Sequence, residues 1–229
     1  MKKLLRILPV FIFVTVLSTP TLCLASAAET AKVYEATAVL SEIMKIPEQS
    51  IPPELLKSAH AVAVIPQVIK AGFVVGGQYG TGILVVRNKE NKWSAPTFIT
   101  ITGGSVGYQI GVESTDLILV FKTSKSIEEI SRGKITLGAG ASVAAGPVGR
   151  SASAATDIKL KAEIFSYSRT RGLFAGVAIQ GSSIAIDNDA NQAYYKQQNI
   201  TSKEVFSGKK IAVPESAKEF IKLLASYTD

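Results

Sequence analysis

The chain contains almost none of the residues that build metal centres or nucleophilic active sites. Its 229 residues include one cysteine, Cys23, and one histidine, His60. A lone histidine and a lone cysteine cannot supply the ligand set of a zinc site, and no serine or aspartate pattern for nucleophilic catalysis adjoins His60. We therefore expect no bound metal, no cofactor and no enzymatic activity.

Phosphate-loop and nucleic-acid signatures are also missing. The run Gly76–Gly82 looks like a phosphate loop, but Ile83 and Leu84 follow it where that loop requires lysine and a hydroxyl residue. The run continues as a strand pattern, whereas a dinucleotide fingerprint opens a helix. The formal charge is +7, and the basic residues form no concentrated stripe, so we expect no nucleic-acid partner.

Three carboxylates give a weak indication of hydrolase chemistry. Glu113, Asp116 and Glu163 are candidates for a carboxylate pair of the kind that hydrolyses glycosides. However, the segment from Glu113 to Asp116 has the composition of a turn between two strands, and no second feature supports catalysis. We interpret Asp116 as a turn residue.

The first 27 residues have the pattern of a secretory signal peptide. The pattern consists of a basic start, an apolar run and a small-x-small cleavage site, namely Lys2, Lys3 and Arg6, then Ile7 to Leu17, then Ala25-Ser-Ala27. An uncleaved membrane anchor is the alternative, but the apolar run is shorter than a spanning helix requires. We expect cleavage near Ala27 and a periplasmic or secreted protein, peripheral to the membrane.

Cleavage after Ala27 would change both the chemistry and the charge of the chain. It removes Cys23 and three positive residues but no negative one, so the formal charge falls from +7 to +4. Such a charge weakly favours anionic partners. The remaining residues, 28–229, contain no linker-like run or repeat of fixed period, and we expect one domain.

Glycine is concentrated in the middle of the chain. None occurs before Gly72, and only Gly208 follows Gly181. Glycine within a strand pattern marks bulges, bends or close backbone approach. We predict an α+β protein with a mainly antiparallel, strongly curved glycine-rich β core, barrel-like or sandwich, flanked by N- and C-terminal helices. Within the core we expect turns at Pro66–Lys70 and around Gly80–Gly82.

The segment Glu29–Lys45 has the pattern of an amphipathic helix. Val33, Leu40 and Met44 recur on one face at helical spacing. This face either packs on the domain's own core or lies on a membrane surface. The polar face carries acidic as well as basic residues, which favours the core. Both interpretations stay open, and the three apolar residues are candidate lipid contacts.

Three arginines lie at or near glycines in the second half of the chain, namely Arg150, Arg169 and Arg171. Arginine forms bidentate hydrogen bonds with phosphate, and neighbouring glycines leave backbone N–H groups accessible. A site for phosphate or a lipid headgroup is one interpretation, and solvated surface arginines are the other. Lys70, which precedes the first glycine run, is a further candidate.

Several ordered segments resemble one known family, the SYLF domain. The resemblance spans roughly Glu29 to Tyr227, and the segments that carry it are Ile69-Lys-Ala-Gly-Phe-Val-Val75, Trp93-Ser-Ala-Pro96, Gly107 through Leu119, Leu137-Gly138, Ala145-Gly-Pro-Val-Gly-Arg150 and Ser168-Arg-Thr-Arg-Gly-Leu-Phe-Ala-Gly-Val177. Any one of these glycine runs would be a weak signal, but the ordered set is specific.

The resemblance implies a lipid-binding module without catalysis. Eukaryotic members bind phosphoinositides, partly through an N-terminal amphipathic helix, and some bundle actin, whereas bacterial relatives look like exported envelope proteins. The matching helix here departs from the basic eukaryotic pattern, and the signal peptide argues against actin. We expect an exported protein of the bacterial type that binds phospholipid through anionic headgroups. A structural or interaction protein of the cell envelope that binds a protein or glycan is the alternative.

Overall fold

The computed structural model describes residues 21–45, 50–148, 162–170, 173–176, 179–208 and 211–228. Its helices are α1 (Thr21–Met44), α2 (Pro53–Lys57), α3 (Ser124–Ser131), α4 (Asn188–Tyr195), α5 (Ser202–Ser207) and α6 (Glu215–Ala225). Its strands are β1 (Ala61–Val86), β2 (Thr97–Phe121), β3 (Lys134–Thr136), β4 (Val143–Ala145), β5 (Ile164–Thr170), β6 (Leu173–Gly176) and β7 (Ser182–Ile186).

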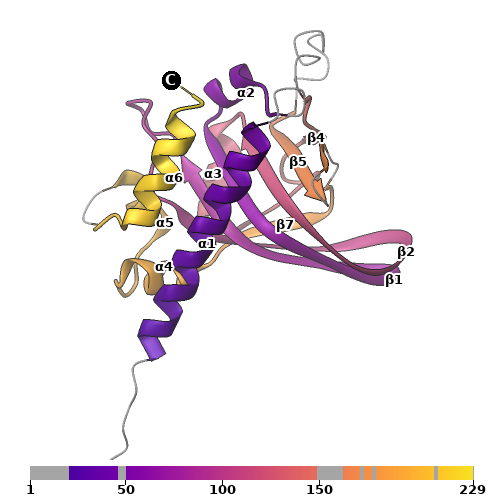
Figure 1. The fold of residues 1–229 in the computed structure, drawn as a ribbon, viewed down its shortest axis with the longest axis horizontal. Helices are drawn as coiled ribbons and strands as arrows, with labels where there is room; N and C mark the ends of the chain where they lie inside the picture. Colours follow the sequence, from indigo (N-terminus) through magenta and orange to yellow (C-terminus); the bar gives the residue numbers. More distant parts are fainter. Residues whose placement is uncertain are drawn as a thin grey trace, which may run out of the picture.

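The described strands form one curved sheet with β2 at its centre. The order is β3-β7-β2-β5-β4, while β1 pairs with β2 and β6 with β5. All pairs are antiparallel except β4 with β5. One end of β2 pairs with β7 and the other with β5, so the long strand passes from one part of the sheet to another (Figure 1). The predicted α+β class with a curved, mainly antiparallel sheet is confirmed, and the sheet is an open, barrel-like one.

β1 is folded back on itself. It pairs with β2 from Ala61–Phe121 to Leu84–Thr97, with register shifts at Ile65/Val68 and Gly72/Val74. The Arg87 N–H donates to the His60 carbonyl at 2.8 Å, so the residues that flank the two ends of β1 are neighbours. The segment between therefore runs outward and returns. We call its paired outer part, residues 69–80 of β1 with 102–114 of β2, the tongue.

The fold-back depends on a close backbone approach at Gly82. A Cβ atom at this position would lie 2.6 Å from Ile65 Cα, and still closer to the carbonyl oxygen of Val64. Real Cβ atoms do not tolerate such distances to backbone, and the neighbouring strand cannot move without breaking its own pairing. Gly82 is thus the position where the returning half of β1 crosses the outgoing half.

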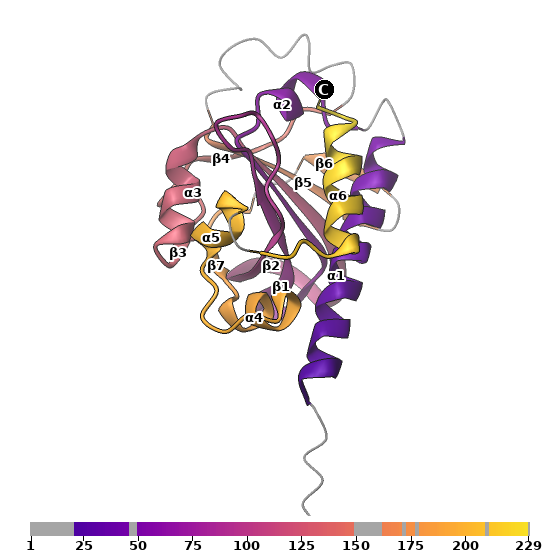
Figure 2. The same ribbon diagram turned by 90° about the vertical axis from the view of Figure 1, so that its left-hand side faces the viewer.

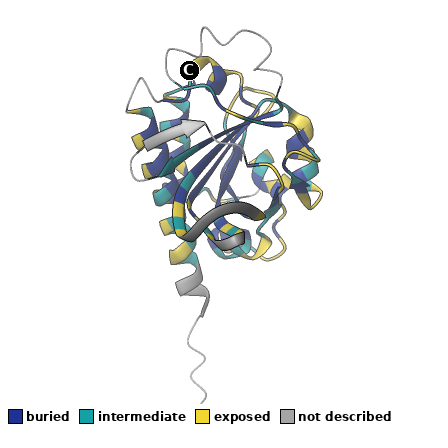
Figure 3. Ribbon diagram, turned by 90° about the vertical axis from the view of Figure 1, so that its right-hand side faces the viewer, coloured by how far each residue is buried: buried dark blue, intermediate teal, exposed yellow. Residues whose placement is uncertain are grey.

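Both faces of the sheet's central part are buried. On one face lie Val62, Val64, Ile118 and Val120, and on the other Ala63, Ile65, Leu117 and Leu119. Helices α1 and α6 cover the first face and α3 lies on the opposite side (Figure 2). Figure 3 shows the buried strands between helices whose outer surfaces are exposed. Leu117–Phe121 is buried on both sides of the sheet, as its unbroken apolar run predicts.

Several helices begin at residues that are typical of helix starts. Asp187 caps α4 and accepts from the Ala190 N–H at 3.0 Å, as its position before the helical pattern predicts. α6 begins directly after Pro214, a residue typical of the first turn of a helix. α5 begins with a capping box between Thr201 and Glu204.

Three turn predictions in the β core are wrong. Pro66–Lys70 is part of β1, where Gln67, at φ 53°, lies within a register shift. Gly80–Gly82 also lies within β1, and its glycines allow a close crossing of the strand instead of a hairpin turn. Likewise the segment from Glu113 to Asp116 is not a turn, because it lies inside β2. A glycine-rich sequence indicates that backbone segments approach closely, but it does not indicate which segments do so.

Among the described residues, no helix combines the length and apolarity that a bilayer crossing requires. α1 starts before the expected cleavage point at Ala27 and continues through it.

We expect Gly82→Ala to lower the free energy of unfolding by about 1–3 kcal/mol, because the added methyl group overpacks a backbone crossing. Gly104→Ala is the matched control, since a Cβ there meets no atom within 4 Å. Urea denaturation of both variants measures the difference. Equal midpoints for the two variants would contradict the role assigned to Gly82.

Candidate functional site

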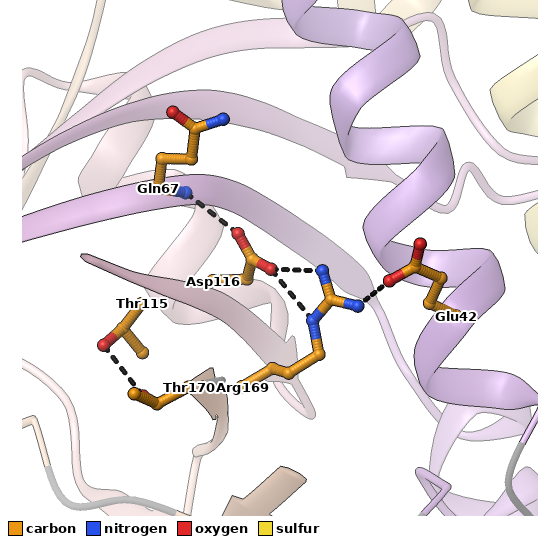
Figure 4. Close-up of polar contacts among 6 residues, drawn as sticks. All are labelled: Glu42, Gln67, Thr115, Asp116, Arg169 and Thr170. Atoms are coloured by element: carbon orange, nitrogen blue, oxygen red, sulfur yellow. Dashed lines mark hydrogen bonds and ion pairs between the residues drawn. The ribbon is translucent and has the colours of Figure 1, made fainter. Parts of the chain in front are cut away.

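Arg169 joins three elements of the fold. From β5, its Nε and one terminal nitrogen donate to Asp116 Oδ2 on β2 at 2.9 and 2.6 Å. Its other terminal nitrogen contacts Glu42 Oε2 on α1 (Figure 4). The Arg169 cluster, defined as Arg169, Asp116 and Glu42, therefore connects the first helix to the sheet.

The two carboxylates of the cluster lie in different environments. The Asp116 side chain is 13% exposed, and its second oxygen accepts from the Gln67 N–H at 3.0 Å. Burial raises the pKa of Asp116, and the hydrogen bond from the Gln67 N–H opposes that rise. The Glu42 side chain is 50% exposed. Glu42 is thus the partner of Arg169 that is open to solvent and that another anion can replace.

A pocket of about 480 Å³ opens beside the cluster, between α1 and the β1–β2 pair. Its lining residues are Glu35, Ala38, Val39, Pro66, Gln67, Ser114, Asp116 and Arg169. Lys32 pairs with Glu35 at 2.7 Å on the same helix. The pocket thus presents polar groups of both signs, and Arg169 is its cationic lining residue.

The structure places the predicted site residues in different environments. Val33 and Leu40 are fully buried in the core, and Met44 is partly buried against it. Val33 and Leu40 are therefore not open to a lipid while α1 is docked, and Met44 is open only in part. Lys70 is half-buried on β1, in register with Glu113. Arg150 and Arg171 lie outside the described residues, so the proposed grouping of the three arginines stays a prediction.

Sequence reasoning missed Asp116 and Glu42 as partners of Arg169. Asp116 was interpreted as a turn residue, and Glu42 as part of the solvent face of its helix. No local pattern connects residues separated by more than 50 positions, such as Asp116 and Arg169. Within the part of the chain that the structure describes, no group of His, Cys, Asp and Glu is arranged to hold a metal ion.

The sequence matches one family model and several known proteins whose names refer to the same family. A family model described as "Ysc84: Las17-binding protein actin regulator" matches residues 102–227. Protein YSC84 of Saccharomyces cerevisiae is 41% identical over 182 residues, which cover 78% of this chain and 38% of that protein. SH3 domain-containing YSC84-like protein 1 of Xenopus laevis is 36% identical over 184 residues, covering 80% and 54%.

The mouse protein of the same name is 33% identical over 201 residues, covering 85% of this chain and 58% of the relative. The chain thus spans roughly two fifths to three fifths of the length of the curated relatives it matches.

We expect Asp116→Asn to destabilise the fold more than Glu42→Gln. Asp116 is mostly buried and accepts charge-assisted hydrogen bonds, which are worth about 1.5–3 kcal/mol. Glu42 is half exposed, and such ion pairs contribute less than about 1 kcal/mol. Chemical denaturation of both variants ranks them. The opposite ranking would show that the helix contact, not the strand contact, dominates the cluster.

Proposed function

Because the chain belongs to the Ysc84/SYLF domain family, we propose that it is a non-catalytic protein that binds phospholipid at membrane surfaces. The observation that carries this proposal is the position of Arg169. It lines a pocket of about 480 Å³, and one of its two carboxylate partners, Glu42, is half exposed. A guanidinium in this position is suited to an anionic headgroup.

The headgroup binds by replacing Glu42. A phosphate presents several acceptor oxygens and pairs with arginine in a bidentate manner. Asp116 stays in place, because it is mostly buried and also bound to the Gln67 N–H. The exchange leaves the strand contact of Arg169 intact and releases only the helix contact. Arg150 and Arg171 lie outside the described residues, and the proposal includes them because each is a cation near a glycine in the sequence.

The apolar part of the lipid contact is not assigned to the docked first helix. Val33 and Leu40 contribute to the core together with residues of the sheet. Their burial supports the core interpretation of the helix. They become lipid contacts only if α1 leaves the sheet, which the exchange at Glu42 would favour by removing one of its attachments.

Export through an N-terminal signal peptide is part of the proposal. It rests on the basic, apolar and small-x-small pattern of residues 1–27. Cleavage after Ala27 retains the described core contacts of α1, because Val33 is the first buried residue among those of the helix whose burial is described. The shortened helix therefore retains its apolar contacts.

Binding to a protein linked to actin is the second candidate function. The family description refers to Las17 binding and actin regulation, and one yeast relative is named "LAS seventeen-binding protein 3". These names do not support the expectation that actin is excluded as a partner. Co-sedimentation with actin filaments, in the presence and absence of vesicles, separates this function from lipid binding.

We expect Glu42→Gln to strengthen binding to vesicles that contain phosphatidylglycerol by about fivefold, since a competing anion worth roughly 1 kcal/mol is removed from Arg169. Glu219→Gln is the matched control, because it removes one exposed negative charge on α6. Vesicle co-sedimentation at low salt measures both. Equal affinities for the two variants would assign the gain to net charge and remove Arg169 from the site.

Arg150→Gln combined with Arg171→Gln should weaken the same binding and flatten its dependence on salt, because each change removes a positive charge whose attraction to anionic lipid is screened within about 10 Å at 0.1 M salt. Neither residue belongs to the Arg169 cluster. Wild-type affinity across the salt series would remove these two arginines from the proposal.

The exported protein should begin at Ala28, a result that intact-mass measurement of the secreted or periplasmic material decides. An N-terminus retained at Met1, or acyl chains on Cys23, would overturn the proposed cleavage.

A further inference from the structure

The outer part of the tongue contains no charged residue. Lys70 and Glu113 are register partners at its base. Beyond them, no Asp, Glu, Lys or Arg occurs from Ala71 to Val86 or from Trp93 to Val112. Proteins normally protect exposed strands from association with charged side chains, especially lysine. The absence of charge here indicates that something covers the tongue.

The large apolar side chains that are exposed concentrate on this element. Among the described residues they are Val112, Tyr79, Ile69 and Tyr34, at 77%, 55%, 49% and 44% exposure. All but Tyr34 belong to the tongue. Ile69 and Val112 lie on its outgoing leg, and Tyr79 lies on its returning leg. The apolar groups are therefore distributed around the element instead of forming one flat face.

The tongue also extends away from the rest of the fold. From Gly104 to Thr115, the described partner of β2 is β1 alone, so the element is two-stranded there. Figure 1 shows β1 and β2 extending to one side, away from α1 and α6. Five or six residues outward at about 3.3 Å each give a reach of up to roughly 20 Å. This reach exceeds the roughly 5–10 Å depth of the interfacial zone of a bilayer.

We propose that the tongue enters the interfacial zone of a phospholipid bilayer, with Val112 and Tyr79 contacting lipid. The inference rests on the proposed phospholipid-binding function and names the element that supplies its apolar contact. A bilayer surrounds an element that inserts into it, so a bilayer can contact the apolar groups on both legs of the tongue. A second copy of the chain would instead need one broad complementary face. Tyrosine is favoured at this depth.

The backbone limits how deep the tongue goes. The inner edges of its strands pair with each other, but the outer edges have no described strand partner along the two-stranded part. Unpaired backbone groups are costly in hydrocarbon but find water and headgroups at the interface. The tongue therefore rests at the headgroup–acyl boundary and does not cross the bilayer.

Two measurements on the full chain test the inference. In 1 M NaCl, where charge interactions are screened within about 3 Å, Val112→Asp should weaken binding to phosphatidylcholine–phosphatidylglycerol vesicles about tenfold. Gln198→Asp adds the same charge at an exposed position between α4 and α5 and should bind like the wild type. Circular dichroism and thermal unfolding confirm that both variants fold.

The second measurement uses an environment-sensitive fluorophore attached to a cysteine. Because Cys23 is the only cysteine of the chain, Cys23→Ser allows one new cysteine to carry the label. Cys23→Ser with Val112→Cys should show a blue-shifted, brighter emission when vesicles are added, and Cys23→Ser with Gln198→Cys should not. The inference is wrong if the wild type binds vesicles, the emission of the label at position 112 does not change, and Val112→Asp binds as tightly as the wild type. This outcome would leave the proposed phospholipid binding intact.

Two other outcomes also overturn the inference. A blue shift that grows with protein concentration in the absence of vesicles assigns the tongue to contacts between copies of the chain. Failure of the wild type to bind vesicles at any salt concentration removes the proposed function and the tongue's role together.

Discussion

The fold depends on one close backbone contact, the crossing of β1 over itself at Gly82. The outgoing half of the strand passes so near that position that no side chain can be present there. Because β2 pairs with β1 along most of its length, the bend in one strand imposes a bend in the other. The bend produces both the curved sheet, with buried residues on its two faces, and the tongue beyond it.

The Arg169 cluster is the second constraint, and it decides how the first helix is held. Apolar contacts of Val33 and Leu40 fix α1 on the sheet, and the Glu42–Arg169 pair adds a polar attachment near the end of the helix. Asp116 keeps the guanidinium oriented from the other side. Arg169 is thus both a candidate for headgroup binding and a structural link between the helix and the sheet. In the proposed exchange, ligand binding at Arg169 is therefore coupled to the docking of α1.

The pocket and the tongue are continuous along β2. Ser114 and Asp116 line the pocket, and Val112 lies two residues further out, on the same face by the two-residue period of a strand. A phospholipid is amphipathic in the same order, with a charged phosphate next to apolar chains. If both proposals hold, the headgroup occupies the pocket while the bilayer surrounds the tongue, and the two contacts reinforce each other on one molecule.

Some properties of this protein were determined by local sequence. Helix ends at Asp187 and Pro214 follow from capping chemistry, and the burial of Leu117–Phe121 on both faces follows from its unbroken apolar run. The concentration of glycine predicted a curved β core, because glycine permits close backbone approach. The family resemblance was carried by ordered segments and is confirmed by the comparisons.

The long-range arrangement was decided only by the tertiary structure. Glycine indicates that backbones approach but not which ones, so Gly80–Gly82 was interpreted as a turn instead of a crossing. Asp116 and Glu42 became partners of Arg169 because sheet register and helix docking bring distant positions together. The same holds for Val33 and Leu40: an amphipathic pattern fixes which side chains share a face, and only the packing of the helix decides whether that face meets the core or a lipid.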